Sequence, residues 1–516
     1  MILPSKESLR REGSPPPGDL LVGKRKGAGL LRLRWETRWL LLVTVCYVVA
    51  QPLLLHMHRF LGYDEAVYVN QVYPAVAPTD FSAPRARGVP WMISPVTLFS
   101  PPVFIIRYYL LAVCGALLFV AFRAWIPVLR MRAVAAAALF AVGWMTLFYG
   151  TEIMPNLPAA LGEIAAAGYL AQHLSLQADD RTRRRALVKA AVAVGLVAVV
   201  RPTEATYLTL GLLVAAATRN RRLLLTRLAV LGGGLVIGWL PWAIEAYLRY
   251  GGFIARLRAA SANAETAGFH PANMWHYLTL TDGPLEGTTD TTAPVLGYVW
   301  WLLLVIGIAF AIGRAIRYRD RTAAVAACGG LAVAMEYLLF DTVVQARFLL
   351  PAYGLLTVCL VAGLPSLPAA RVPRVAAWAA ITILFAAFAG WNFNTVRLQD
   401  NQQYFARKGS LQLAQVLRKL SPHGPCFFAS QFGFPEIAFA SGCRAADIGP
   451  LATRIDLPVA PGSAPVYVLT VTNPDELAIR PVPGTVRKLR DISPGWWLFI
   501  APRASLRVLG QLLRSY

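Results

Sequence analysis

The chain has 516 residues, of which 56% are hydrophobic and only 15% are charged. Soluble proteins average roughly 25% charged residues, so lipid is the simplest solvent for much of this chain. The formal net charge is +23, but the basic residues cluster in short segments between apolar runs. That distribution is the positive-inside pattern of membrane proteins, and it argues against a nucleic-acid-binding protein.

Residues 1–37 are polar and basic, include Pro15, Pro16 and Pro17, and lack the apolar core of a cleavable signal peptide. We expect them to form a cytoplasmic tail. A membrane-spanning helix needs about 20 mostly apolar residues. Eleven such runs follow, at about 38–57, 103–122, 132–149, 155–173, 186–200, 203–217, 228–247, 294–313, 322–340, 347–365 and 375–393. Because proline disfavours a continuous helix, Pro202 predicts a break between the fifth and sixth runs.

The charges between the runs predict the orientation. With the N-terminus inside, the short inner segments carry 27 basic residues, whereas the outer loops up to residue 347 carry 8. Ten or twelve spans would destroy this asymmetry. The two long loops, 58–102 and 248–293, then lie on the outer side of the cell (inner) membrane, where we expect the active site.

The composition changes near residue 395. Residues 397–419 predict an amphipathic helix, and short strand-like runs follow at 426–429, 466–469 and 496–500, separated by turn residues. We therefore predict an all-α polytopic membrane domain of about eleven transmembrane helices at 38–394, and a small extracytoplasmic α/β domain at 395–516. Cys426 and Cys443 lie in this polar region and could form a disulfide there.

Two acidic motifs mark the predicted outer face. Asp64 and Glu65 directly follow the first span, and Glu152 lies between the third and fourth spans. A transferase that acts on a hydroxyl needs a base at such a place. The alternative is structural, since Asp64 could cap a helix while Glu65 and Glu152 favour positive helix ends.

Arginines and aromatic residues occur on the same face. A guanidinium binds phosphate well, which makes Arg85, Arg87, Arg201 and Arg347 candidate phosphate ligands, although each could instead contact lipid headgroups. Polar and aromatic side chains suit sugar binding but also suit an interfacial belt. The candidate substrate-binding residues are Tyr63, Tyr68, His270, Trp275 and His276. No zinc motif, P-loop or GxSxG motif occurs, and we predict no metal ligands.

In this order and on this side, these motifs resemble the C-type glycosyltransferase (GT-C) superfamily, specifically the bacterial relatives of protein O-mannosyltransferases and of the aminoarabinose transferase of lipid A. The resemblance rests on Asp64-Glu65, on Glu152 with Met154-Pro155, on Arg201-Pro202 and on the run from Arg347 to Pro351. It covers about residues 35–395. The family commonly has Asp in the second acidic motif, where this chain has Glu152.

The resemblance implies a polyprenyl-phosphate sugar as the donor and a hydroxyl of a lipid, protein or glycan as the acceptor. Asp64 would take the proton of the hydroxyl, and attack would invert the anomeric carbon. Glu65 and Glu152 would position base or acceptor, while Arg347 with Arg201 or Arg85 would stabilise the leaving phosphate. No cofactor is required, although a divalent cation could sit near the carboxylates.

Two other functions remain open from the sequence. A flippase or transporter of a lipid-linked sugar would share the size and the arginines, but should carry charged residues deep within its spans. A non-catalytic protein of envelope assembly would use the C-terminal domain for contacts.

Overall fold

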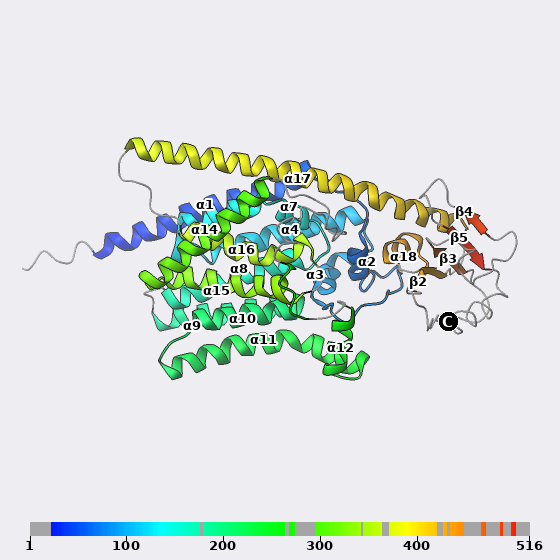
Figure 1. Ribbon diagram of the computed structural model, residues 1–516, viewed down its shortest axis with the longest axis horizontal. Helices are drawn as coiled ribbons and strands as arrows, with labels where there is room; N and C mark the ends of the chain where they lie inside the picture. Colours follow the sequence, from blue (N-terminus) through cyan, green and yellow to red (C-terminus); the bar gives the residue numbers. More distant parts are fainter. Residues whose placement is uncertain are drawn as a thin grey trace, which may run out of the picture.

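The computed structural model describes most of the membrane domain and parts of the C-terminal region. The described residues are 22–175, 179–263, 268–273, 295–341, 344–363, 371–420, 427–430, 434–447, 466–470, 486–488 and 497–501. The elongated molecule consists of a helical bundle with a small sheet beyond one of its ends (Figure 1). We call this the sheet end of the bundle.

Long helices form the body of the bundle. They are α1 (Val22–Leu54), α4 (Val103–Arg123), α8 (Asn156–Ser175), α9 (Asp180–Val200), α10 (Pro202–Ala215), α11 (Arg221–Tyr250), α14 (Val295–Arg317), α15 (Arg321–Met335), α16 (Leu350–Gly363) and α17 (Arg371–Leu420). Helix α8 is buried along most of its length and packs against α4, α9, α15 and α16. Ala and Gly residues on α8 allow these close approaches.

Shorter helices complete the bundle. They are α2 (Tyr63–Val69), α3 (Gly88–Thr97), α5 (Ile126–Leu129), α6 (Met131–Ala141), α7 (Trp144–Tyr149), α12 (Phe253–Asn263), the π-helix η1 (Glu336–Phe340) and the 3₁₀ helix η2 (Ala346–Leu349). Helices α2, α3 and α12 lie at the sheet end (Figure 1).

Helical segments occur at each of the eleven predicted spans, with two departures in detail. The predicted run 132–149 is divided into α6 and α7, because Val142 and Gly143 interrupt the helix. Helix α17 runs without a break across residue 394, where we had placed the end of the membrane domain. The predicted break at Arg201-Pro202 is confirmed: Arg201 leaves the helical conformation and ends α9, while Pro202 begins α10.

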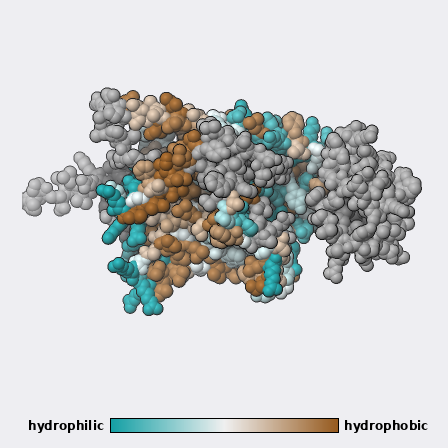
Figure 2. Space-filling view, in the orientation of Figure 1, coloured by the Kyte–Doolittle hydropathy of each residue, from teal (hydrophilic) through white to brown (hydrophobic). Residues whose placement is uncertain are grey.

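Six helices of the described chain are long and apolar enough to cross a membrane, judged by length and composition. Exposed apolar side chains also cover the sides of the bundle, for example Val192 and Leu196 on α9 and Ile237 on α11. Figure 2 shows this apolar surface along the helices, with hydrophilic side chains gathered towards the ends. Such a surface is unfavourable in water and favourable in lipid, which indicates a multi-pass membrane protein.

In the C-terminal region, the described residues form a five-stranded sheet and the helix α18 (Pro435–Ser441). Its strands are β1 (Phe427–Ser430), β2 (Arg444–Asp447), β3 (Val466–Thr470), β4 (Val486–Lys488) and β5 (Trp497–Ala501). The sheet order is β2-β1-β3-β5-β4, with β1 parallel to β2 and β3, and with β5 antiparallel to β3 and β4. The three predicted strand-like runs overlap β1, β3 and β5.

Helix α18 connects this region to the bundle. The side-chain amide of Asn70, which follows α2, donates a hydrogen bond to the Pro435 carbonyl over 3.0 Å. The ring of Phe439 packs edge-on against Tyr73, with centroids 4.8 Å apart. Cys443, just after α18, is disulfide-bonded. Its predicted partner, Cys426, lies outside the described residues.

Candidate functional site

Asp64 lies in the first turn of α2, at the sheet end of the bundle. The helix begins after Gly62, whose backbone N–H donates to Glu65 Oε2 over 2.9 Å. Glu65 therefore satisfies the helix start, which leaves the Asp64 side chain for other partners. That side chain is 26% exposed, whereas the Glu65 side chain is 2% exposed.

Two arginines from distant parts of the chain hold the Asp64 carboxylate. Arg85 Nη2 lies 2.6 Å from Oδ1, and Arg347 Nη2 lies 3.0 Å from Oδ2. Burial alone would raise the pKa of Asp64, but Arg347 and Arg85 outweigh it and hold that pKa below its ordinary value. The structure thus brings together the predicted base and two predicted phosphate ligands, and Asp64 is ionised at neutral pH.

A third arginine, Arg201, packs against the same aromatic ring as Arg347. Arg201 Nε is 3.3 Å from Glu204 Oε1, and its Nη1 is 3.4 Å from the Tyr337 hydroxyl. The guanidinium groups of Arg201 and Arg347 lie 5.7 Å and 5.2 Å from the ring centroid of Phe348. Tyr337 stacks on the same ring at 5.3 Å. Phe348 therefore packs with both arginines, and the charge of Arg201 also acts on Asp64.

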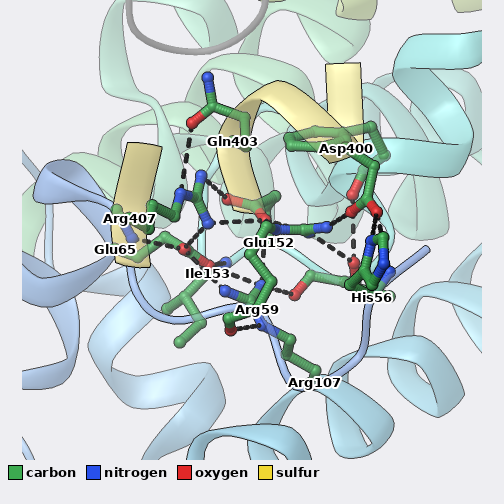
Figure 3. Close-up of polar contacts among 12 residues, drawn as sticks. His56, Arg59, Glu65, Arg107, Glu152, Ile153, Asp400, Gln403 and Arg407 are labelled. Carbon is green, nitrogen blue, oxygen red and sulfur yellow. Dashed lines mark hydrogen bonds and ion pairs between the residues drawn. The ribbon is translucent and has the colours of Figure 1, made fainter. Parts of the chain in front are cut away.

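Glu65 and Glu152 belong to a buried charge network (Figure 3). Arg107 donates from Nη1 to both of them over 3.0 Å, and Arg407 bridges them from the other side at 2.8 Å and 3.0 Å. Arg59 also pairs with Glu152. The side chains of these five residues are each at most 4% exposed. Such complete pairing is what makes buried charges tolerable.

The network continues to Asp400 on α17. Arg59 forms an ion pair with Asp400, which also accepts hydrogen bonds from the His56 backbone N–H at 2.9 Å and from its ring Nδ1 at 2.5 Å. Three arginines thus meet three carboxylates, so their formal charges cancel. Burial would raise the pKa of Glu152, but Arg407, Arg59 and Arg107 hold it well below its ordinary value.

Arg87 lies apart from Asp64. It pairs with Glu245 at 2.5 Å, donates to Gln71 Oε1 at 2.9 Å, and lies over the Phe81 ring. Its guanidinium is therefore occupied by a structural contact between the first outer loop and α11.

The predicted substrate-binding residues have different environments. Tyr68 is buried and its ring lies 5.9 Å from the Arg85 guanidinium, while Tyr63 is partly buried beside Asp64 in the sequence. The backbone N–H of His270 donates to the carbonyl of Leu339 in η1. Trp275 and His276 lie outside the described residues.

Sequence reasoning missed Arg59, Arg107, Asp400 and Arg407 as parts of the site. Arg107 offered a signal, because an arginine inside a predicted span is costly unless it is paired. Asp400 and Arg407 offered none, since they fall in a predicted amphipathic helix far along the chain. Within the described residues, no group of three or more His, Cys, Asp or Glu side chains has an arrangement suited to a metal ion.

The fold is that of C-type glycosyltransferases. The chain is similar to ArnT from Cupriavidus metallidurans bound to undecaprenyl phosphate, with a TM-score of 0.55 and 14% identity over 84% of this chain and 93% of that one. It is also similar to the apo oligosaccharyltransferase of Archaeoglobus fulgidus, with a TM-score of 0.53 and 12% identity over 80% of this chain and 64% of that one. Neither a protein-family model nor a curated protein matches the sequence.

Proposed function

We propose that this protein is a membrane glycosyltransferase that moves a sugar from a polyprenyl-phosphate donor to a hydroxyl of an acceptor outside the membrane. The observation that carries the proposal is the partly exposed Asp64 carboxylate, held between Arg85 and Arg347. A base beside two phosphate-binding groups suits a reaction in which a hydroxyl loses a proton while a phosphate leaves. The fold, and the undecaprenyl phosphate bound to ArnT, support this class.

In the proposed reaction, the acceptor hydroxyl gives its proton to Asp64 and its oxygen attacks the anomeric carbon of the sugar. The new carbon–oxygen bond forms as the bond to the phosphate oxygen breaks, and the electron pair stays on the polyprenyl phosphate. Attack opposite to the leaving group inverts the anomeric carbon. Arg347 and Arg85 would stabilise the charge that develops on the phosphate, with Arg201 beside them on Phe348.

The same arginines would also control the base. In the absence of donor, Arg347 and Arg85 bind Asp64 and lower its pKa, so the Asp64 carboxylate is a weak proton acceptor. A donor phosphate competes for the same guanidinium groups. As they turn to the phosphate, the pKa of Asp64 rises and the carboxylate becomes a better base. Donor binding would therefore precede deprotonation of the acceptor.

Glu65 and Glu152 would act as positioning residues, because they are buried and paired with arginines. Their network fixes the loop before α2 and the connection between α7 and α8. Tyr63, Tyr68 and His270 remain candidate substrate contacts. Arg87 would position the outer loop through Glu245 rather than bind the donor.

We place the protein in the cell membrane with all eleven predicted spans crossing it, residues 1–37 in the cytoplasm and residues 395–516 outside. The basic residues 181–189 lie near the start of α9, and Arg201 lies at its other end. This arrangement supports the positive-inside assignment, with Asp64 at the outer surface. The partners are then membrane lipids, a lipid-phosphate donor and a lipid, protein or glycan acceptor.

A second candidate function is transport of a lipid-linked sugar. It is favoured by Glu163, a fully buried acid within α8, because ionisable residues inside a membrane often mark a transport pathway. A transporter would translocate the donor without breaking its sugar–phosphate bond, which separates the two functions chemically.

The decisive experiment follows the release of polyprenyl phosphate by the purified protein in lipid nanodiscs. The protein would receive a panel of polyprenyl-phosphate sugars with envelope extract as the acceptor source, with and without EDTA. Since Asn keeps the shape of Asp64 but cannot take the proton, Asp64→Asn should lower turnover about 100-fold or more while leaving the protein folded. Asp80→Asn is the matched control, because Asp80 is an exposed residue of the same loop.

Release by the wild type and by Asp80→Asn, but not by Asp64→Asn, supports the transferase and names the sugar. Full activity of Asp64→Asn would overturn its assignment as the base. Movement of intact donor across the bilayer without release would instead support transport. Loss of turnover in EDTA would revise the expectation that no cofactor is required.

A further inference from the structure

Three carboxyl groups lie buried inside the helical bundle and interact electrostatically, close to the Asp64 site but not part of it. Glu163 comes from α8, Glu204 from α10 and Glu336 from η1. Glu163 and Glu204 are fully buried and Glu336 is 9% exposed. Helix α15, which continues into η1, packs against both α8 and α10. Glu204 and Glu336 act electrostatically on Glu163, and Glu204 acts on Glu336.

These carboxyl groups lack the donors that ionised acids need. Neither oxygen of Glu163 has a hydrogen-bond partner in the described chain, and Oε2 of Glu204 and Oε2 of Glu336 have none either. Glu204 Oε1 is supplied by the Tyr337 hydroxyl and by Arg201, and Glu336 has a hydrogen bond with the Thr203 side chain. An ionised carboxylate can only accept hydrogen bonds, whereas a protonated one also donates. Protonation would therefore remove a buried charge and give the carboxyl group a donor.

The balance of charges around these carboxyl groups also favours their protonation. Among the described residues, Arg201 is the one cation that acts on all three carboxyl groups. The other groups that face them are acidic, phenolic or hydroxylic: Asp341, Tyr337, Tyr207 and Thr203. Three ionised carboxylates and one guanidinium would leave two uncompensated negative charges in a low-dielectric bundle, which is strongly unfavourable.

We propose that Glu163, Glu204 and Glu336 form a proton-binding site that holds two protons at neutral pH. The metal alternative is less suited, because no three acidic side chains of the described chain are arranged to hold an ion. The π-helical turn η1 places Glu336 and Tyr337 consecutively at this site, and such turns are frequent at functional sites.

Arg201 links the proton-binding site to the Asp64 site. Arg201 pairs with Glu204 at one end, and its charge acts on Asp64 at the other. When the cluster holds its protons, Arg201 has fewer anions competing for it and can turn towards a donor phosphate. When the protons leave, the added negative charge binds Arg201 more firmly.

Infrared spectroscopy tests the proposal directly, because protonated and ionised carboxyl groups absorb at different frequencies. The protein in nanodiscs, in a Glu436→Gln background that removes another buried acid, would be examined at neutral pH in water and in deuterated water. We expect carbonyl absorption of protonated acids in the parent, and loss of about one carboxyl equivalent in Glu163→Gln and in Glu336→Gln. Asp80→Asn should leave the absorption unchanged.

No protonated-acid absorption at neutral pH, or absorption unchanged from the parent in both glutamine variants, would overturn the proposal. Two separate variants are used so that misfolding of one leaves the other informative, with helical content measured by circular dichroism. The measurement needs neither donor nor turnover. Failure of the transferase assay would therefore leave this result standing, and the reverse also holds.

Discussion

Asp64 and Glu65 are neighbours in the sequence, yet they have different environments and different proposed roles. Successive residues of a helix point about 100° apart, so the two side chains leave the first turn of α2 in different directions. Glu65 points into the bundle, where Arg107 and Arg407 surround it. Asp64 points towards Arg85 and Arg347 and stays partly exposed. Of the two carboxylates, Asp64 has the exposure that its proposed role as the base requires.

The pairing of Asp64 predicts a pH dependence. Because Arg347 and Arg85 hold the pKa of Asp64 below its ordinary value, Asp64 loses its charge only in strong acid. Removing one cation raises that pKa. In Arg85→Gln, the acid limb of the pH profile of kcat/KM should therefore move to higher pH, and the KM for the donor should rise.

Arg87→Gln is the matched control, since Arg87 pairs with Glu245 instead of Asp64. The pH profiles of kcat/KM for the wild type, Arg85→Gln and Arg87→Gln would be compared in the release assay, because kcat/KM reports the pKa values of groups in the free enzyme. An equal shift in both variants would contradict a specific effect of Arg85 on Asp64.

At the scale of elements, the buried charge network joins segments whose relative positions hydrophobic packing alone would not fix. Arg59 comes from the loop after α1, Arg107 from α4, and Arg407 from α17. Their carboxylate partners lie on α2, on the connection between α7 and α8, and on α17 itself. Ion pairs with fixed geometry add specificity of position that apolar contacts lack. The network therefore fixes the start of α2, and with it Asp64, relative to the bundle.

Removing one cation from this network should be costly. Arg407→Met leaves Glu65 and Glu152 each without one of their arginines, and breaking a buried pair typically costs about 3–5 kcal/mol. We expect a clear fall in the midpoint of thermal unfolding, measured by circular dichroism in detergent micelles. Arg397→Met, an exposed position on the same helix, should unfold like the wild type. Equal midpoints for both variants would show that the network does not stabilise the fold.

At the scale of the whole molecule, α17 connects the bundle to the C-terminal region, and α18 folds back onto α2. Phe439 contacts Tyr73, and Asn70 binds the Pro435 carbonyl. The segment that carries Asp64 is thus held from two sides, by the bundle and by α18. A change in the C-terminal region could in this way reach the proposed active site.

Glu436 gives this junction a pH dependence. Burial raises its pKa from 4.5 to about 7, against the opposing effects of the Ser410 hydroxyl and Arg407. Between pH 4.5 and about 7, Glu436 keeps its proton in the folded protein but has lost it in the unfolded chain. The free energy of unfolding should therefore fall as the pH rises through this range. The loss has an upper bound of about 3 kcal/mol.

Glu436→Gln should remove most of this slope, because glutamine does not titrate. Unfolding would be followed between pH 5 and about 8, around the ordinary and raised values of the group, for the wild type, Glu436→Gln and Asp80→Asn. The control should keep the slope of the wild type. An unchanged slope in Glu436→Gln would assign the pH dependence to another group.

The sequence by itself predicted the helical ranges, the break at Arg201-Pro202 and the position of Asp64 on the same face as Arg85 and Arg347. These features follow from local properties: apolar run length, the geometry of proline, and the sidedness that alternating spans impose. The tertiary structure alone decided which charges meet. Arg407 pairs with Glu65 across 342 positions of sequence, whereas Arg87, two residues from Arg85, pairs elsewhere. Ion pairing depends on distances of a few ångströms between segments, and composition and spacing do not contain those distances.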